Sequence, residues 1–286
     1  MVTVLVTGSG GQLGQCFRVL SKNCTELNFV FKTSKELDIT LKREIEKVFE
    51  APPNINYVIN CAAYTDVDKA ESDFTSANKI NAIGVKNLAE VCVENKTTLI
   101  HFSTDFVFDG TKQQPYTETD STNPINVYGT SKLKGESFIQ DLMTNYFIIR
   151  TSWLYSNFGN NFVKTMLKLG KVKDEISVVD DQIGSPTNAM GLASLILIII
   201  KSKDINYGLY HFSNKGSCSW YEFADEIFQQ KKIEIHLKPI LSSAYKTLTK
   251  RPKYSVLNSS KVEKTFNTEV CEWKEQLKQF FNKNYS

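Results

Sequence analysis

The first fifteen residues place three glycines between a strand-like run and the start of a helical pattern. In VTVLVTGSGGQLGQ, Gly8, Gly11 and Gly14 follow the apolar run 2–7 at intervals of three. Glycine permits a tight turn and lets the backbone approach a pyrophosphate, while a helix N-terminus offers free N–H groups and a favourable dipole. We therefore expect this loop, including Gln12 and Leu13, to bind a dinucleotide.

Short apolar runs then alternate with helical patterns through the first half of the chain. This alternation is typical of a parallel sheet with helices on both faces, and it supplies the context that makes a glycine loop meaningful. The sequence predicts an α/β fold: a Rossmann-type doubly wound parallel sheet in residues 1–152, which binds NAD(P), and a smaller, less regular C-terminal substrate-binding lobe in 153–286, with some segments returning to the sheet. The expected strands are 2–7, 28–34, 56–63, 97–105 and 146–153, and the helices between them are 11–22, 41–51, 81–96 and 126–142.

Composition restricts the class of partner. The net charge is +3 over 286 residues and the lysines are scattered, which argues against nucleic acid. Six cysteines without a close pair indicate a reducing compartment rather than a zinc site. The longest apolar run, 190–200, is shorter than the roughly 20 residues of a membrane span and predicts a buried helix. The N-terminal run has no features of a secretory signal, so we expect a cytoplasmic protein without a membrane partner.

The stretch VYGTSKLKGE places Tyr128 and Lys132 four residues apart. Residues i and i+4 share one face of a helix. A phenol with a pKa of about 10 is a slow proton donor at neutral pH, and a nearby ammonium is expected to lower that pKa. Lys132 can also hydrogen-bond a nicotinamide ribose. Downstream of a dinucleotide loop, this spacing predicts half of an active site, with a hydroxyl from Ser103 or Thr104 at the end of strand 97–105 as the third group.

The three-residue glycine spacing and the tyrosine–lysine pair resemble the extended branch of the short-chain dehydrogenase/reductase superfamily. The resemblance implies that Thr104 polarises the substrate carbonyl and that Ser103 is structural; His101 is interpreted as a packed core residue. A ribose-binding carboxylate is missing at the end of strand 28–34, where FKTSKE places Lys32 and Lys35 instead, so we expect NADPH, with NADH left open as an alternative. The remaining cofactor contacts that the resemblance implies are Asp38 and Ile39 near the adenine, and Ala62, Ala63 and Tyr64 beneath the cofactor.

A set of longer segments resembles one family within that branch, the dTDP-4-dehydrorhamnose reductases. The segments are NCAAYTDVDKAE, STDFVFDG, IRTSWLY, NNFVKTM, DDQIGSPT, GLYHFSN with SWYEFA, and RPKYSVLN, and the resemblance spans residues 2 to about 260. It implies the NAD(P)H-dependent reduction of the C4 keto group of dTDP-4-dehydro-6-deoxy-L-mannose to dTDP-L-rhamnose, a precursor of cell-surface polysaccharide. The implied substrate contacts are Thr65, Asp66, Thr104, Asp105, Phe106, Trp153, Gln182 and Arg251.

Two local differences refine this expectation. Related 4,6-dehydratases carry Thr-Asp-Glu where this chain has Thr104-Asp105-Phe106, so the second acid of an elimination is missing. Some reductases of the family form a magnesium-bridged dimer through glutamates, and the matching positions here are Gln15 and Met190. We therefore expect no metal, and a monomer or weak homodimer.

Two other functions stay open at this stage. One is another nucleotide-sugar reaction of the extended branch, such as epimerisation. The other is a non-catalytic role resembling the regulatory subunit of methionine adenosyltransferase. The complete set of Thr104, Tyr128 and Lys132 favours an enzyme, because a binding module does not need all three.

Overall fold

Six parallel strands form the main sheet of the protein, seen in a computed structural model that describes residues 1–202 and 205–282. Strand order changes direction between β1 and β3, and in doubly wound sheets such a switch point opens a crevice for ligands at the carboxyl ends of the strands. The Rossmann-type fold predicted from the sequence is confirmed. The order is β10-β5-β4-β3-β1-β2, formed by β1 (Val2–Thr7), β2 (Leu27–Phe31), β3 (Tyr57–Asn60), β4 (Thr98–Thr104), β5 (Tyr146–Thr151) and β10 (Gly208–His211).

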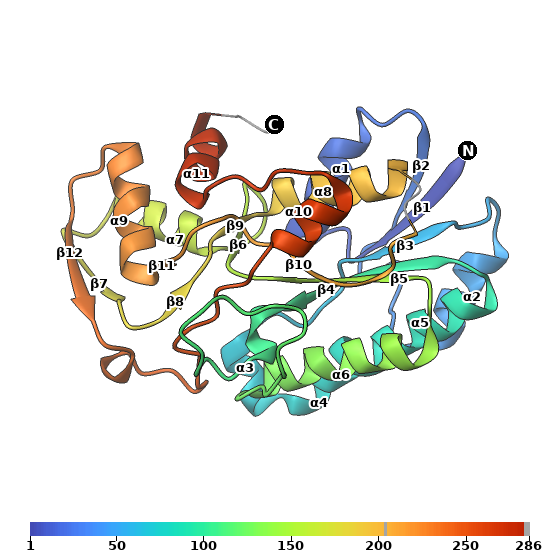
Figure 1. The fold of residues 1–286 in the computed structure, drawn as a ribbon, viewed down its shortest axis with the longest axis horizontal. Helices are drawn as coiled ribbons and strands as arrows, with labels where there is room; N and C mark the ends of the chain where they lie inside the picture. Colours follow the sequence, from blue (N-terminus) through green and yellow to red (C-terminus); the bar gives the residue numbers. More distant parts are fainter. Residues whose placement is uncertain (203–204, 283–286) are drawn as a thin grey trace.

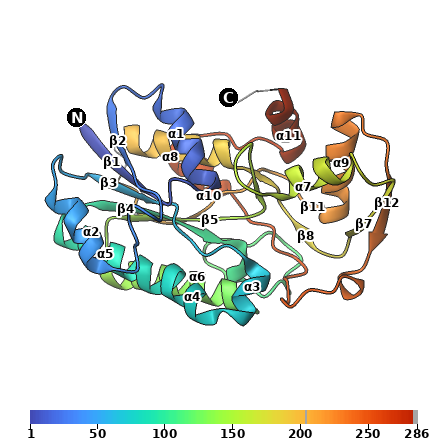
Figure 2. The same cartoon turned by 180° about the vertical axis from the view of Figure 1, so that it is seen from behind.

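Helices cover both faces of this sheet (Figures 1 and 2). Successive side chains of a strand point to opposite faces, so Val4 and Val6 enter one apolar core while Leu5 enters the other. One face carries α1 (Gln12–Ser21), α8 (Ala189–Ser202) and α10 (Ser260–Phe266), and the other carries α2 (Lys42–Glu50), α5 (Val85–Glu94) and α6 (Val127–Leu142).

The C-terminal lobe packs helices and short strand pairs around an aromatic core. Phe223 lies at its centre, fully buried, and Ser219 caps α9 through a capping box with Glu222. The helices of the lobe are α7 (Phe162–Leu169), α9 (Trp220–Lys231) and α11 (Trp273–Asn282); its strand pairs are β7 (Glu175–Val179) with β12 (His236–Ile240), β8 (Ile183–Gly184) with β11 (Cys218–Ser219), and β6 (Leu154–Tyr155) with β9 (Thr187–Asn188).

The segment between β3 and α5 contains elements that were not expected, since the helix expected at 81–96 corresponds to α5 and the end of the turn before it. It contains α3 (Val67–Ser72), α4 (Phe74–Asn78) and a π-helical turn, η1 (Lys79–Gly84). Asp66 and Asp73 cap α3 and α4 by accepting from backbone N–H groups, which divides the chain into short helices. In η1, the Asn81 amide binds the backbone of Tyr64 and so fixes the loop that follows β3.

The apolar run at 190–200 lies within α8, which is buried against the sheet as predicted. In the part of the chain that the structure describes, no helix combines the length and the apolar character required to cross a membrane.

Candidate active site

Thr104, Tyr128 and Lys132 meet at the carboxyl edge of the sheet. Thr104 is the last residue of β4, and the other two lie one turn apart near the start of α6. Asn126 caps that helix by accepting from the Gly129 amide at 2.7 Å. A side chain at Gly129 would collide with the Phe106 carbonyl, so glycine brings the start of α6 directly against the chain that follows β4.

The Tyr128 phenol lies beside the Thr104 hydroxyl and near the Asp105 carboxylate. Burial, followed by the charge of Asp105, raises the pKa of Tyr128 to about 12, while Thr104 acts in the opposite direction. The phenol is therefore protonated at neutral pH, and it is a weaker acid than a free tyrosine. Phe106, expected at the substrate, packs edge-on against Tyr128 with the ring centroids 5.9 Å apart.

Lys132 is buried below Tyr128, with its amine turned toward β4. Its amine donates to the Phe102 carbonyl at 2.6 Å and lies 3.3 Å from His101 Nε2. Burial lowers the pKa of Lys132 to about 8. The expectation that the ammonium lowers the pKa of Tyr128 is wrong for this structure, because the amine turns toward the strand and burial of the phenol dominates.

Asp105 is a buried carboxylate next to the reactive groups. Thr104 Oγ1 donates to its Oδ1 at 3.0 Å, and the Ser255 hydroxyl also favours its charged form. Burial outweighs both hydroxyls and raises the pKa of Asp105 to about 6. The sequence did not predict a role for Ser255, although it lies in RPKYSVLN, one of the segments that resemble the reductase family.

The glycine loop has the shape that a dinucleotide requires. Gly8 has φ +60°, and a Cβ there would lie 2.5 Å from the Ala62 nitrogen. A Cβ on Gly14 would lie 2.5 Å from Ser9 Cα, so glycine lets α1 begin directly on the loop. Gly11 caps α1 without a side-chain hydrogen bond, which leaves the first N–H groups of the helix available for a phosphate. The residues present therefore fit a pyrophosphate.

Gln12 and Leu13 contribute to this loop in different ways. Leu13 is buried in the core beneath the helix. Gln12 connects the loop to the C-terminal lobe, because its amide donates to the Leu154 carbonyl at 3.2 Å and accepts from Asn161 Nδ2 at 2.9 Å. The Gln12 side chain is therefore occupied, and the backbone of Gln12 at the start of α1 is the group available to a phosphate.

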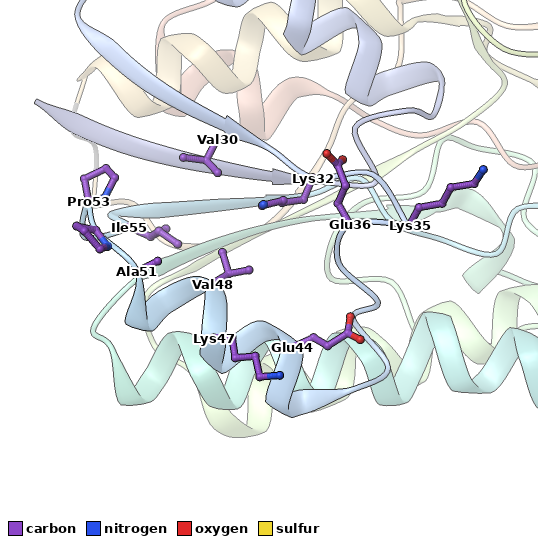
Figure 3. Close-up of a pocket in the computed structure, with 11 residues that line it drawn as sticks. Val30, Lys32, Lys35, Glu36, Glu44, Lys47, Val48, Ala51, Pro53 and Ile55 are labelled. Carbon is purple, nitrogen blue, oxygen red and sulfur yellow. The ribbon is translucent and has the colours of Figure 1, made fainter.

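The end of β2 carries the positive charge expected to select NADPH, but its two lysines do not converge. Figure 3 shows Lys32 and Lys35 extending in opposite directions. Both line a cavity of about 530 Å³, together with residues of β2, α2 and the turn after α2. Arg18, which sequence reasoning missed, lies nearer the glycine loop. Its guanidinium covers the Phe31 ring at 4.5 Å and donates to Ser9 Oγ at 2.9 Å and to the Ser9 carbonyl.

The remaining cofactor residues expected from the sequence lie along the switch point. Ile39 is buried against Gly84, and the Asp38 carboxylate accepts from the Thr40 amide at 2.9 Å. Ala62, Ala63 and Tyr64 follow β3 and stay partly exposed, with Ala62 in contact with Gly8. All of them are at the edge of the sheet where the glycine loop lies.

Trp153 projects from the end of β5 and lies flat on Trp220 of α9, with ring centroids 3.4 Å apart. Trp153 has φ +46°, an uncommon conformation for a large side chain. A Cβ on Gly184 would lie 2.5 Å from the Trp153 ring, so glycine there leaves room for it. Trp220 was not expected at the site, because only the fold brings it to Trp153.

A cavity of about 470 Å³ in the C-terminal lobe lies next to this tryptophan pair. Gln182 and Arg251, both expected at the substrate, line it. Arg251 also donates to Asp68 Oδ2 at 2.7 Å in an ion pair. The other lining residues are Phe162, Thr165, Met166, Leu169, Ile176, Ser177, Val178, Val179, Trp220, Ser242, Tyr245 and Thr247.

Thr65 and Asp66 lie in the loop between β3 and α3. Both are exposed, and the Asp66 carboxylate accepts from the Lys69 amide at 3.0 Å as the cap of α3. The C-terminal segment packs on this region, since Thr249 donates to the Val67 carbonyl and Asn126 donates to the Lys250 carbonyl. The site is thus bordered by both parts of the chain. Across residues 1–202 and 205–282, no cluster of three or more His, Cys, Asp or Glu side chains is arranged to hold a metal.

The glycine loop at the switch point, together with a tyrosine and a lysine one turn apart beside a strand-end threonine, defines an enzyme fold of the short-chain dehydrogenase/reductase class. More specifically, the chain belongs to the family described as RmlD substrate binding domain, which matches residues 2–286. It is 40% identical to a dTDP-4-dehydrorhamnose reductase of Aggregatibacter actinomycetemcomitans, over 97% of this chain and 98% of that protein. It is 39% identical to the spore coat polysaccharide biosynthesis protein SpsK of Bacillus subtilis, over 100% and 99%.

Solved structures agree with this placement. A dTDP-4-dehydrorhamnose reductase from Bacillus anthracis, in complex with NADP, superimposes with a TM-score of 0.94 at 41% identity, covering 99% of this chain and 100% of that one. A UDP-glucose 4-epimerase from Thermus thermophilus shares the fold, with a TM-score of 0.82 at 17% identity. The family predicted from the sequence segments is therefore confirmed.

Proposed function

We propose that this protein reduces the C4 keto group of dTDP-4-dehydro-6-deoxy-L-mannose to give dTDP-L-rhamnose, with NADPH as the reductant. The relatives named dTDP-4-dehydrorhamnose reductase are similar over nearly the whole chain, and the related Bacillus anthracis structure contains NADP. The observation that carries the proposal is the meeting of Thr104 and Tyr128, with Lys132 beneath them, at the carboxyl edge of the sheet.

Bound NADPH would supply the hydride that adds to C4 of the sugar. The negative charge that develops on the carbonyl oxygen needs a proton, and the protonated Tyr128 phenol is the donor that we assign. Thr104 Oγ1 lies beside that phenol, and it would orient and polarise the same oxygen by turning its proton from Asp105 toward the substrate. Because Phe106 replaces the second acid of the dehydratases, the site has a proton donor for reduction but lacks that base for elimination.

Lys132 and Asp105 modify this proton transfer. Lys132 provides a buried amine that can bind the nicotinamide ribose and support the tyrosine. Burial and, after it, the Asp105 carboxylate raise the pKa of Tyr128, so the phenol holds its proton more tightly than a free tyrosine does. We propose that Asp105, Phe106 and Trp153 contact the sugar.

We assign the two parts of the chain to the two ligands. Residues 1–152 would hold the dinucleotide through the glycine loop, Asp38, Ile39 and the stretch 62–64, with Lys32 and Arg18 near the 2′-phosphate. Residues 153–286 would mainly hold the sugar nucleotide. The 470 Å³ cavity has the size and the mixed apolar and polar lining of a small-molecule site, and its Arg251 guanidinium suits a diphosphate. Gln182 would bind the base or sugar, and Thr65 and Asp66 would border the entrance.

We further propose a cytoplasmic monomer or weak homodimer that needs no metal and has neither a nucleic-acid nor a membrane partner. The six cysteines are all free thiols, as is usual in a reducing compartment. Met190, at one of the positions where some relatives place a bridging glutamate, is buried in α8.

The test is to incubate the purified protein with dTDP-4-dehydro-6-deoxy-L-mannose and NADPH and to identify the sugar by NMR. We expect dTDP-L-rhamnose with the consumption of one NADPH for each sugar formed. An epimerised sugar without net loss of NADPH would indicate the epimerase alternative, and NADPH binding without turnover would indicate a regulatory role. Either result contradicts the proposal.

A further inference from the structure

A chain of four polar side chains crosses the sheet beneath α6. Thr7, Asn60 and His101 are register neighbours on β1, β3 and β4, and all three are buried. Thr7 Oγ1 donates to Asn60 Oδ1 at 2.7 Å, Asn60 Nδ2 lies 3.1 Å from His101 Nδ1, and His101 Nε2 lies 3.3 Å from Lys132 Nζ. The chain therefore ends at the lysine of the proposed active site.

The position of each proton in this chain follows from its neighbours. The Ala62 backbone N–H can only donate, and it donates to Asn60 Oδ1 at 3.1 Å, which identifies that atom as the oxygen of the amide. Asn60 Nδ2 is then a donor, so His101 Nδ1 must accept. Burial and the neighbouring Lys132 lower the pKa of His101 well below its usual range, so the ring is neutral. A neutral imidazole that accepts at Nδ1 carries its single proton on Nε2.

This tautomer decides how His101 meets Lys132. The Nε2–H group points at the lysine nitrogen and cannot accept a hydrogen bond from it. Lys132 Nζ already donates to the Phe102 carbonyl at 2.6 Å. The contact with His101 is attractive when Nζ offers a lone pair, as a neutral amine does, and it sets two N–H groups against each other when Nζ is an ammonium.

We propose that His101 is a positioning residue which, held by Asn60 as the Nε2–H tautomer, fixes the place of Lys132 and favours its neutral amine over the ammonium before the dinucleotide binds. This inference rests on the proposed function in so far as it takes Lys132 as part of the active site. Glu136, on the same helix, acts in the opposite direction but is paired with Arg150 at 2.7 Å. Cys61, after β3, also favours the ammonium, but burial raises the pKa of that thiol and keeps it neutral.

The histidine tautomer can be read directly by NMR of the whole protein labelled with ¹⁵N-histidine. The chain has three histidines, and the His101→Gln variant assigns the signal. We expect His101 to be neutral, with its proton on Nε2, from pH 6 to 9 (roughly from the ordinary histidine pKa of about 6.5 upward). His211 is a matched internal control, because its Nδ1 faces the Tyr116 carbonyl at 3.1 Å and must carry the proton there. A proton on Nδ1 of His101, or titration of His101 in this range, overturns the proposal.

The effect on the lysine is tested with Asn60→Asp, which has nearly the same shape but accepts where the amide donates. We expect the His101 proton to move to Nδ1 and the pKa of Lys132 to rise by about one unit or more, because the ring nitrogen then accepts from the ammonium and the new carboxylate adds its charge. His101→Asn adds no charge and so isolates the effect of the imidazole. The pKa is followed by NMR of ¹³C-lysine, with the signal assigned through Lys132→Met. In His101→Asn, which keeps an acceptor for Asn60 but withdraws from Lys132, the pKa should also rise.

An unchanged Lys132 pKa in Asn60→Asp, with the tautomer shifted, would overturn the proposal. If Asn60→Asp does not fold, the tautomer of His101 in the native protein still tests the proposal. None of these measurements uses the sugar substrate, so a failure here is separate from a failure of the proposed reaction. In activity assays, the limb of kcat/KM that reports Lys132 should move to higher pH in His101→Asn, a change that a purely structural role would not produce.

Discussion

Trp153 lies flat against Trp220, with ring centroids 3.4 Å apart and ring planes within 9° of each other. The pair joins the end of β5 to the first residue of α9, and so joins the catalytic edge of the sheet to the lobe with the 470 Å³ cavity. Trp153 holds an unusual backbone conformation at φ +46°, a form of strain that often accompanies functional sites.

Replacing Trp220 with leucine removes the stacking partner of Trp153. Such aromatic pairs contribute about 0.5–1.5 kcal/mol beyond the area they bury. We therefore expect KM for the sugar nucleotide to rise about 2- to 10-fold, while KM for NADPH stays unchanged, in steady-state kinetics. Tyr221→Leu is the matched control, because Tyr221 packs on the core of the lobe. Equal losses for both substrates would contradict the assignment of this pair to the sugar side.

Asp105→Asn should stabilise the protein in a pH-dependent way. Burial raises the pKa of Asp105 from 3.8 to about 6, so the folded state disfavours the carboxylate. The resulting loss in the free energy of unfolding grows as the pH rises from below the pKa of the unfolded state through the pKa of the folded state. We expect the variant to gain about 3 kcal/mol at pH 8 and roughly half of that at pH 5. Urea unfolding at the two pH values measures the difference. A gain that is independent of pH would show that the carboxylate carries no such cost.

Arg18→Met and Lys32→Met should each weaken NADPH binding more than NADH binding. Charge-assisted hydrogen bonds contribute about 1.5–3 kcal/mol, so we expect the ratio of kcat/KM for NADPH to that for NADH to fall about tenfold or more. Lys35→Met should change little, because its amine extends away from Lys32 (Figure 3). Unchanged ratios in both variants would place the 2′-phosphate elsewhere.

The sequence predicts the parts of the site that depend on local spacing. Gly8, Gly11 and Gly14 lie within one turn and the start of one helix, and Tyr128 and Lys132 lie within one helical turn, so periodicity alone places each set together. The strand-and-helix alternation is likewise local, and the sheet that it predicts is the sheet observed.

The missed features depend on contacts between distant segments. Trp220 reaches Trp153 across 67 positions of sequence, and no local pattern announces that contact. His101 was interpreted as a packed core residue; it is buried as expected, but the register of β3 and β4 and the packing of α6 give it Asn60 and Lys132 as partners. The pKa of Tyr128 was predicted in the wrong direction because burial, which exceeds the influence of a lysine one turn away, is set by the whole fold.

Tyr128 is the group to which we assign the proton for a reduction at C4. The most direct measurement compares native protein with Tyr128→Phe for single-turnover formation of dTDP-L-rhamnose from dTDP-4-dehydro-6-deoxy-L-mannose and NADPH, alongside the Kd for NADPH. General-acid catalysis contributes about 10²- to 10⁴-fold, so we expect the rate to fall by that factor while the Kd changes little. If Tyr128→Phe forms the product at nearly the native rate, another group donates the proton and the assignment of Tyr128 is wrong.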